Sequence, residues 1–346
     1  MDVLTARPQL LKQANRSLIR RAIKNAGTAT RAEIAEETRI SSTTVRSLLT
    51  EMMENGEIES MGYDESSGGR KAERYRFRPD CYHAAAFCMT DDEVHYLLIN
   101  VCGEIVEKDR LSVLDGDVEG AVFTCMDDLT HRLKLRAIGL GVPGVVEGGR
   151  YWKKRPADED LRQMDFGERL TRRYGLPVVM ENDLKATAIG FGRCYRERYP
   201  DEDPESTNMA YLSFENGCAS AAFLVGGKIV RGHSNFAGEI SLIPMEDGSL
   251  CTCSFTDELD DLEYVKKVAG ILVWICGILN PQYIALGGPS LRDRCIGQIG
   301  DELYALLPRK MCAEILYAPD MWRDYHLGMA QLTAAKMFDA IQIIKE

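Results

Sequence analysis

Two short helices, predicted close together near the N-terminus, constrain the fold more than any other feature of the sequence. The first begins at Thr30-Arg31-Ala32-Glu33, a capping box in which the Thr30 hydroxyl and the Glu33 carboxylate each satisfy a backbone N–H of the first turn. The second begins at Ser41-Ser42, which offers an N-cap, and ends at Asn55-Gly56. Its apolar stripe consists of Val45, Leu48, Leu49 and Met52. A helix, a turn and a second helix form the arrangement that lets a helix enter the major groove of DNA.

We expect the DNA contacts to lie on the face of this helix opposite the apolar stripe. Its small hydroxyl side chains permit a close approach, and Arg46 is suited to read guanine or to grip a phosphate. The predicted DNA-binding residues of this helix are Ser42, Thr43, Thr44, Arg46 and Ser47. A longer amphipathic helix precedes the pair, and the basic residues on its polar side are Lys12, Arg16, Arg20, Arg21 and Lys24.

A basic hairpin follows the two helices. Residues 58–61 and 74–77 are predicted to be its strands, joined by the segment 66–71. An arginine on a glycine hairpin suits the narrow minor groove, so Gly69, Arg70 and Lys71 are further predicted DNA contacts. Two alternatives stay open: the whole segment serves only for protein contact, or Arg46 and Arg70 are solvated surface charges.

The distribution of charge is compatible with this prediction. The chain has a net charge of -11, but its first 80 residues hold 14 Lys and Arg against 12 Asp and Glu. A polyanion would therefore meet the first segment. No apolar run is long enough to cross a bilayer, and the sequence begins without a secretory signal. With 11 scattered cysteines expected to be reduced, we predict a cytoplasmic protein without membrane association.

The rest of the chain alternates apolar strands with helices, which predicts an α/β fold in two lobes separated by a cleft. We expect a DNA-binding domain over residues 1–80 and a second domain over residues 81–346. The first lobe of that domain would cover about 81–190 together with the C-terminal helix, and the second lobe about 191–325.

Several short motifs, in this order and spacing, resemble the ROK family (repressors, open reading frames, kinases). In the second domain the motifs are Gly141-Val142-Pro143-Gly144, Glu181-Asn182-Asp183, Phe236-Ala237-Gly238-Glu239 and the stretch from Asn280-Pro281 to Gly287-Gly288. In the first domain they are Asn15–Ile19, Arg31–Ala35, Ser41–Val45 and Gly68-Gly69-Arg70. The resemblance implies a winged helix-turn-helix followed by an actin-like, sugar-kinase-like ROK domain. It also implies a homodimer or tetramer, an inverted-repeat operator in double-stranded DNA, and control of carbohydrate genes.

The chemistry of a sugar kinase is expected to be lost. A kinase holds ATP phosphates against backbone amides, which requires glycines where side chains would block the approach. The family's first phosphate turn is an Asp-x-Gly-x-Thr pattern, whereas residues 87–92 here contain no glycine. The second turn, at residues 215–221, keeps one glycine and adds Glu215. We therefore predict a transcriptional regulator, most simply a repressor, that is not an enzyme.

Asp183 matches the family's catalytic base, but without a phosphate donor it has nothing to transfer. The resemblance instead implies a site for a small carbohydrate effector, formed by Gly144, Asn182, Asp183 and Glu239. The alternative for Asp183 is a helix cap, and for Glu239 a structural role. Two other functions remain open: an active ROK sugar kinase with an accessory DNA-binding domain, and a regulator that uses its second domain only for assembly.

The resemblance further implies a structural zinc, held by one His and three Cys. Here Leu242 occupies the place of that His, and Glu258 the place of the third Cys, so that only Cys251 and Cys253 remain. Two thiols and one carboxylate fall short of the four ligands of a closed site, so we expect no zinc and no other cofactor. The alternative is that another residue, such as His233, completes the site.

Overall fold

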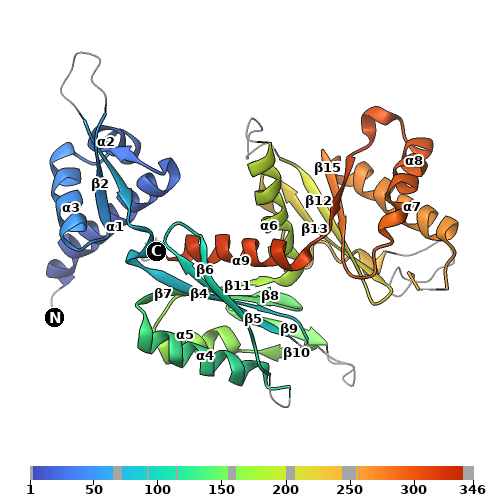
Figure 1. The fold of residues 1–346 in the computed structure, drawn as a ribbon, viewed down its shortest axis with the longest axis horizontal. Coiled ribbons are helices and arrows are strands. Elements are labelled where there is room, and N and C mark those ends of the chain that lie inside the picture. Colours follow the sequence, from blue (N-terminus) through green and yellow to red (C-terminus); the bar gives the residue numbers. More distant parts are fainter. Residues whose placement is uncertain are drawn as a thin grey trace. The chain divides into compact units, whose positions relative to one another are not determined.

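Two units, each with its own core, make up the chain. The computed structural model describes residues 3–64, 72–91, 93–113, 116–154, 161–199, 207–243, 255–256 and 258–337 (Figure 1). Unit 1 comprises Met1–Leu140, Phe166–Val179 and Ala330–Glu346, and unit 2 comprises Gly141–Asp165 and Met180–Met329. No helix within the described ranges is long and apolar enough to cross a membrane.

Unit 1 begins with three helices and a small sheet. The helices are α1 (Val3–Ala26), α2 (Arg31–Thr38) and α3 (Ser42–Glu54). The strands β1 (Ala29–Thr30), β2 (Ile58–Tyr63) and β3 (Glu73–Phe77) pair in the order β1-β3-β2, and β2 and β3 are antiparallel. The predicted pair of helices and the predicted hairpin strands are therefore present.

Local capping sets the limits of α2 and α3. The Thr30 hydroxyl accepts a hydrogen bond from Glu33 N–H, the Glu33 carboxylate accepts one from Thr30 N–H, and Ser41 caps α3 through Thr44 N–H. Helix α2 ends at Arg39, whose φ of 56° is left-handed. The buried stripe of α3 then packs on α1 and α2 in one core, whose largest fully buried members are Ile19, Ile23, Ile34, Leu49 and Met52.

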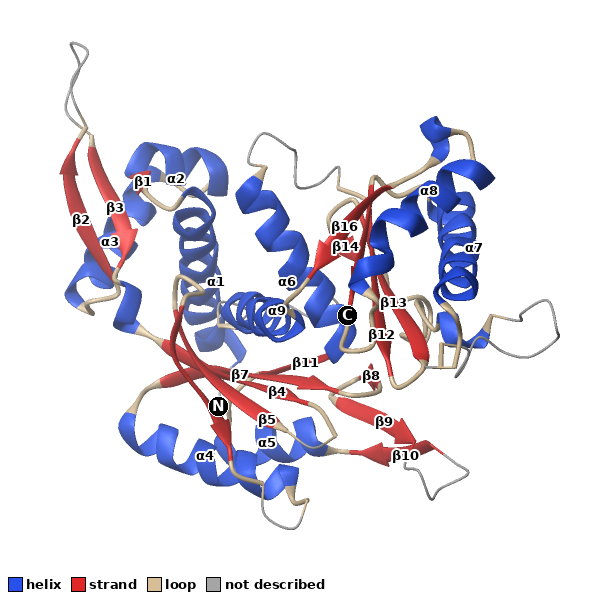
Figure 2. Ribbon diagram, turned by 45° about the vertical axis from the view of Figure 1, so that its right-hand side comes forward, coloured by secondary structure: helices blue, strands red, loops and turns tan. Residues whose placement is uncertain are grey.

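The second part of unit 1 is a five-stranded sheet in the order β11-β7-β4-β5-β6. Its strands are β4 (His83–Met89), β5 (Val94–Asn100), β6 (Ile105–Leu111), β7 (Leu135–Val142) and β11 (Val178–Asn182). Helices α4 (Val118–Arg132) and α5 (Phe166–Tyr174) cover one face of it (Figures 1 and 2). The last residues of β7 and β11 belong to unit 2.

Unit 2 is built on a second five-stranded sheet in the order β14-β13-β12-β15-β16. Its strands are β12 (Met209–Glu215), β13 (Cys218–Val225), β14 (Lys228–Ile229), β15 (Tyr283–Gly287) and β16 (Glu314–Ala318). Alternate residues of β12 point to opposite faces. Leu212 and Phe214 pack with α7 (Asp261–Leu279) and α8 (Ile296–Leu306), whereas Met209 and Tyr211 pack with α6 (Asp183–Arg198) (Figure 2).

Shorter elements complete unit 2. Strands β8 (Val145–Glu147), β9 (Arg150–Lys154) and β10 (Leu161–Met164) form a small antiparallel sheet. Helix α9 (Met321–Lys336) begins in this unit and ends in unit 1. Glycine lets α9 approach α6 closely, because a Cβ at Gly190 would lie 1.8 Å from the Asp324 carbonyl oxygen.

Candidate nucleic-acid interface and ligand site

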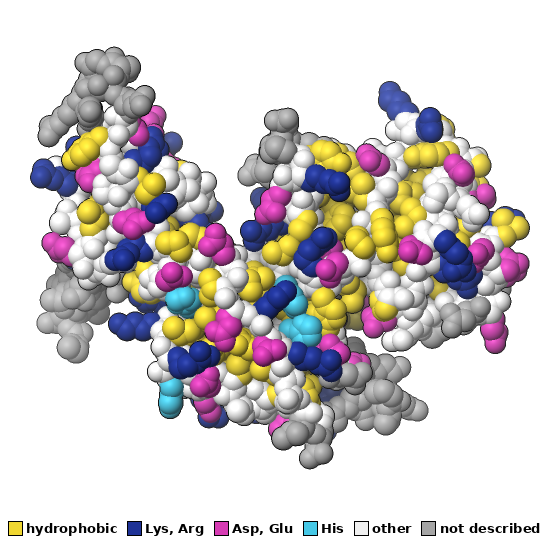
Figure 3. Space-filling model, in the orientation of Figure 1, with side chains coloured by type: hydrophobic (Ala, Val, Ile, Leu, Met, Phe, Trp, Pro, Cys, Tyr) yellow, Lys and Arg dark blue, Asp and Glu magenta, His cyan; other side chains and the backbone are white. Residues whose placement is uncertain are grey.

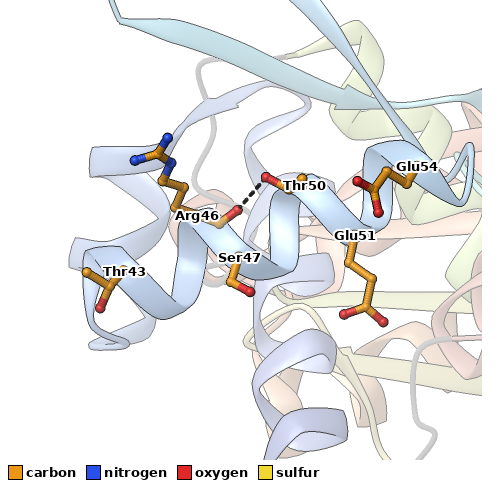
Figure 4. A pocket seen from close by; sticks show the side chains of 6 residues that line it. All are labelled: Thr43, Arg46, Ser47, Thr50, Glu51 and Glu54. Carbon is orange, nitrogen blue, oxygen red and sulfur yellow. Dashed lines mark hydrogen bonds between the residues drawn. The ribbon is translucent and has the colours of Figure 1, made fainter.

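The outer face of α3 carries the predicted recognition residues. Ser42, Thr43, Arg46 and Ser47 are exposed, whereas Thr44 is half-buried in the N-cap, its hydroxyl 2.8 Å from the Ser41 hydroxyl. This face lines an open hollow of about 510 Å³ whose residues are Thr43, Arg46, Ser47, Thr50, Glu51 and Glu54 (Figure 4). Arg46 and Glu51 point to different sides of the helix (Figure 4). Four of the five predicted α3 contacts are therefore accessible, and Thr44 acts mainly in the cap.

Ion pairs join α1 to Glu51 of α3 and to Glu57, which follows that helix. The Glu57 carboxylate is fully buried and accepts hydrogen bonds from Arg16 Nη2 and Arg20 Nη2, each at 3.1 Å. Glu51 pairs with Lys12 Nζ at 2.7 Å. Three of the basic residues predicted along α1 therefore stabilise the packing of α1 on α3, and sequence reasoning missed both acidic partners.

Among the described residues, the arginines of the hairpin are paired with carboxylates, whereas three arginines of α2, α3 and the turn between them are not. Arg74 of β3 bonds to Asp64 at 2.9 Å and to Glu33 at 3.1 Å, and Arg76 bonds to Glu59 at 2.7 Å. Arg31, Arg39 and Arg46 are exposed, and their guanidinium groups form no hydrogen bond or ion pair within the described part of the chain. On the face seen in Figure 3, basic and acidic side chains are interspersed over the N-terminal elements. Which arginines are unpaired therefore matters more for an anionic partner than the total charge.

Three predicted contacts cannot be placed. Gly69, Arg70 and Lys71 at the hairpin tip lie outside the described residues.

A second candidate site lies at the N-terminus of α6 in unit 2. Asn182 is the N-cap, and its Oδ1 accepts a hydrogen bond from Lys185 N–H at 3.0 Å. Its Nδ2 donates to the Gly144 carbonyl oxygen at 3.1 Å and to Asp183 Oδ1 at 2.8 Å. The capping role considered for Asp183 thus belongs to Asn182. The structure brings Gly144, Asn182 and Asp183 together, and the Asn182 side chain is fully engaged in holding them.

Lys185 lies beside these residues, and sequence reasoning missed it. The side chain is buried, and Nζ donates a short hydrogen bond to the Asn235 carbonyl oxygen. Burial lowers the pKa of Lys185, while the nearby carboxylates of Glu181 and Glu239 oppose that shift. The only signal in the sequence is its position three residues after the N-cap, in the first turn of the helix.

Two further bonds join the loop after β14 to the same site. Asn235, whose φ is 60°, donates from Nδ2 to the Val146 carbonyl oxygen, and Arg231 pairs with the buried Glu181. We name Gly144 to Val146, residues 181–185 and residues 231–239 together the cradle. Its three segments are joined by side-chain hydrogen bonds.

Glu239 is the last residue of the cradle. Burial of its carboxyl raises the pKa of Glu239, with Lys185 opposing the shift, although the residue as a whole is exposed. The preceding Gly238 has a φ of 104°, and a Cβ there would lie 2.1 Å from the Ala221 carbonyl oxygen. Only glycine fits that position without moving the backbone.

The two turns that should hold phosphate in a kinase are short and internally bonded. Between β4 and β5, the Thr90 hydroxyl accepts a hydrogen bond from Glu93 N–H at 3.1 Å. Between β12 and β13, Glu215 pairs with Cys218 across Asn216 and Gly217, both at positive φ. This is a tight two-residue hairpin turn.

The expected metal position is only partly described. Cys251 and Cys253 lie outside the described residues. Leu242, Glu258 and His233 are exposed, and the described ranges hold no group of three His, Cys, Asp or Glu side chains placed to bind a metal ion.

Comparison with known proteins identifies the family. Residues 91–262 match the sequence profile of the ROK family. The xylose repressor of Caldicellulosiruptor bescii is 24% identical over 277 residues, which cover 75% of this chain and 67% of that protein. The regulator NagC of Escherichia coli is 21% identical over 79% of this chain and 67% of its own length. A glucokinase of Halalkalibacterium halodurans is 27% identical, but over only 50% of this chain and 54% of its own.

Solved structures show the same fold. A ROK family transcriptional regulator, homologous to the MLC protein of Escherichia coli, superposes with a TM-score of 0.66 at 15% identity and covers 95% of this chain and 97% of its own. A ROK family glucokinase from Streptomyces griseus gives a TM-score of 0.53 at 15% identity, over 73% of this chain and 99% of its own. The profile match, together with the relatives named as repressors, makes the chain a member of the ROK family, and the solved structures show the same fold.

Proposed function

We propose that this protein is a sequence-specific DNA-binding transcriptional regulator, most simply a repressor, of carbohydrate-related genes. The outer face of α3 carries the proposal: polar side chains and Arg46 are exposed above a packed pair of helices, and the Arg46 guanidinium has no hydrogen-bonded partner in the described ranges. In this proposal α1 to β3 form a winged helix-turn-helix, with α3 in the major groove. The relatives named as repressors support the assignment.

The DNA target would be an inverted repeat bound by a homodimer or tetramer. A two-fold assembly presents two α3 helices to two half-sites, so the operator mirrors the symmetry of the protein. The cradle would hold a small carbohydrate effector, with Asp183 and Glu239 as acceptors for its hydroxyl groups.

The ROK domain would be non-catalytic, because its two turns are closed by their own backbone and hydroxyl bonds. An active sugar kinase is the second candidate, since the glucokinase relative and Asp183 favour it. Its specific test is a coupled assay with Mg-ATP over a panel of hexoses and aminosugars. Turnover that disappears in Asp183→Asn would establish the kinase.

Selection of bound duplexes from a random library tests the regulator directly. The full-length protein should enrich a palindromic sequence. Arg46→Ala should reduce affinity for that sequence by about 1 to 3 kcal/mol if Arg46 contacts a base. Arg21, an exposed arginine of α1 that lines neither hollow, provides the matched control in Arg21→Ala. Failure to enrich any palindrome would argue against sequence-specific binding.

A further inference from the structure

A second hollow lies beside α3, between that helix and the hairpin. It has a volume of about 500 Å³, and its lining residues are Arg31, Arg46, Thr50, Met53, Glu54, Glu73 and Tyr75. Arg31 is the first residue of α2, so the hollow brings one guanidinium from each of the two predicted helices to a common space. Sequence reasoning did not select Arg31.

Neither arginine side chain has a bonded partner within the described residues. Arg31 is exposed and its guanidinium forms no hydrogen bond or ion pair there, and the same holds for the guanidinium of Arg46. Their neighbour Arg74 is different, because Asp64 and Glu33 both bind it. Two guanidinium groups that line one hollow without an ion-paired partner can both donate to an anion there.

The acidic residues of the hollow, Glu54 and Glu73, form no ion pair with Arg31 or Arg46 within the described residues. The Glu73 carboxylate accepts a hydrogen bond from the Tyr75 hydroxyl at 2.7 Å. Glu54 lies eight residues after Arg46 on α3, which is about 12 Å along the helix. The N–H donors of both guanidinium groups therefore remain available to a ligand in this hollow.

We propose that Arg31 is a DNA contact and that a backbone phosphate lies between Arg31 and Arg46 in this hollow. The inference rests on the proposed function, and it extends the interface from α3 to the start of α2. Guanidinium groups suit phosphate because their paired N–H donors match its oxygens. The hollow is open and continuous with the outer face of α3, since Arg46, Thr50 and Glu54 line both hollows. A phosphate belonging to a groove-bound duplex is therefore the occupant that this position fits.

The test compares the full-length protein with Arg31→Ala, Arg31→Lys and Arg21→Ala. The probes are the duplex enriched by selection and a random duplex of equal length, each titrated between roughly 50 and 200 mM salt. Because a phosphate contact carries no sequence information, Arg31→Ala should weaken both duplexes about tenfold and lower the salt slope by about 1. Arg31→Lys should recover part of the loss, and Arg21→Ala should change affinity less than about twofold.

Three results would overturn the assignment: unchanged affinity in Arg31→Ala, a loss confined to the selected duplex, which would indicate a base contact, or an equal loss in Arg21→Ala, which would indicate a general effect of charge. The thermal unfolding of each variant shows whether the fold is intact. Failure of the wild-type protein to bind either duplex is a separate result, because it would reject the proposed function itself.

Discussion

The outer face of α3 and the cradle use polar side chains in opposite ways. On α3, Arg46 and its hydroxyl neighbours are exposed, and the bonds that anchor this region to α1 are made by Glu51 and Glu57. In the cradle, Asn182, Lys185 and Asn235 are engaged in hydrogen bonds between segments. Substitutions on the α3 face should therefore change binding without changing stability. Substitutions in the cradle should change local stability first.

The largest expected effect is a loss of stability on substitution of Glu57, the buried residue that follows α3. In Glu57→Gln, the partly buried Arg16 and Arg20 lose their common carboxylate, so the free energy of unfolding of the α1–α3 region should fall by about 3 kcal/mol. Hydrogen exchange at the α1 and α3 amides, measured on the full-length protein, checks this value.

Glu54→Gln is the matched control for Glu57→Gln, because Glu54 lies exposed on the outer face. It should leave exchange unchanged and tighten DNA binding, since one negative charge is removed from the proposed interface. Equal destabilisation by the two variants would contradict the distinction between the inner and outer faces.

A second prediction concerns Asp324, a buried carboxylate of unit 2 that, unlike the bonded polar side chains of the cradle, has one oxygen without a hydrogen-bond partner among the described residues. Asp324 Oδ1 accepts hydrogen bonds from Arg323, but Asp324 Oδ2 is buried without a partner among the described residues. Burial raises the pKa of Asp324 to about 6. This pKa exceeds the value of about 3.9 in the unfolded chain. Between about pH 3.9 and about pH 6 the folded state therefore binds more protons at Asp324 than the unfolded state does.

The stability that Asp324 contributes should therefore fall as pH rises from about 4 to about 6, and remain constant above that range. Relative to Asp324→Asn, the wild-type protein should lose about 2 kcal/mol over this interval. Thermal unfolding as a function of pH measures the difference, with the exposed Asp301→Asn as control. A difference between wild type and Asp324→Asn that does not depend on pH would show that Asp324 is ionised throughout.

Local patterns in the sequence predict much of the α3 region. The caps at Thr30 and Ser41 and the buried stripe of α3 depend on residues within a few positions of each other, and all are present as predicted. The ion pairs behind α3 could not be predicted in this way, because Arg16 and Glu57 are 41 residues apart. Periodicity shows that a basic residue lies on the polar side of a helix, but it cannot show whether a carboxylate from a distant part of the sequence pairs with that residue.

The cradle was predicted less completely, for the same reason. The motifs that resemble the ROK family led to Gly144, Asn182, Asp183 and Glu239, but Lys185 matches none of those motifs. Its importance comes from Asn235, 50 residues away, whose carbonyl oxygen it binds. The division into residues 1–80 and 81–346, the predicted hairpin-tip contacts and the absence of zinc stay predictions.

A third prediction tests whether Lys185 holds the cradle together. Lys185→Met keeps the length of the side chain but removes the donor to the Asn235 carbonyl oxygen, so hydrogen exchange over residues 232–243 should accelerate about tenfold. The α3 amides should not change. Lys228, an exposed lysine of β14, gives the control Lys228→Met. Unchanged exchange over residues 232–243 would mean that the Asn235–Val146 bond suffices to hold this loop.

The smallest expected effect lies in the turn between α2 and α3. Arg39 has a φ of 56°, is exposed, and forms no hydrogen bond or ion pair within the described ranges. Because a residue with a Cβ is strained there and glycine is not, Arg39→Gly should stabilise the protein by about 0.5 to 1 kcal/mol. Asn280→Gly, at a φ of 45° after α7, is the control and should gain less, since asparagine tolerates this conformation.

DNA binding by the same Arg39→Gly variant sharpens the comparison between the two regions. If Arg39 belongs to the proposed interface, Arg39→Gly will melt at a higher temperature and yet bind both duplexes more weakly with a lower salt slope, because it removes strain and one cation together. Weaker binding without the gain in stability would assign Arg39 a structural partner in the free protein. Greater stability with unchanged binding would limit the interface to the face of α3 and to Arg31.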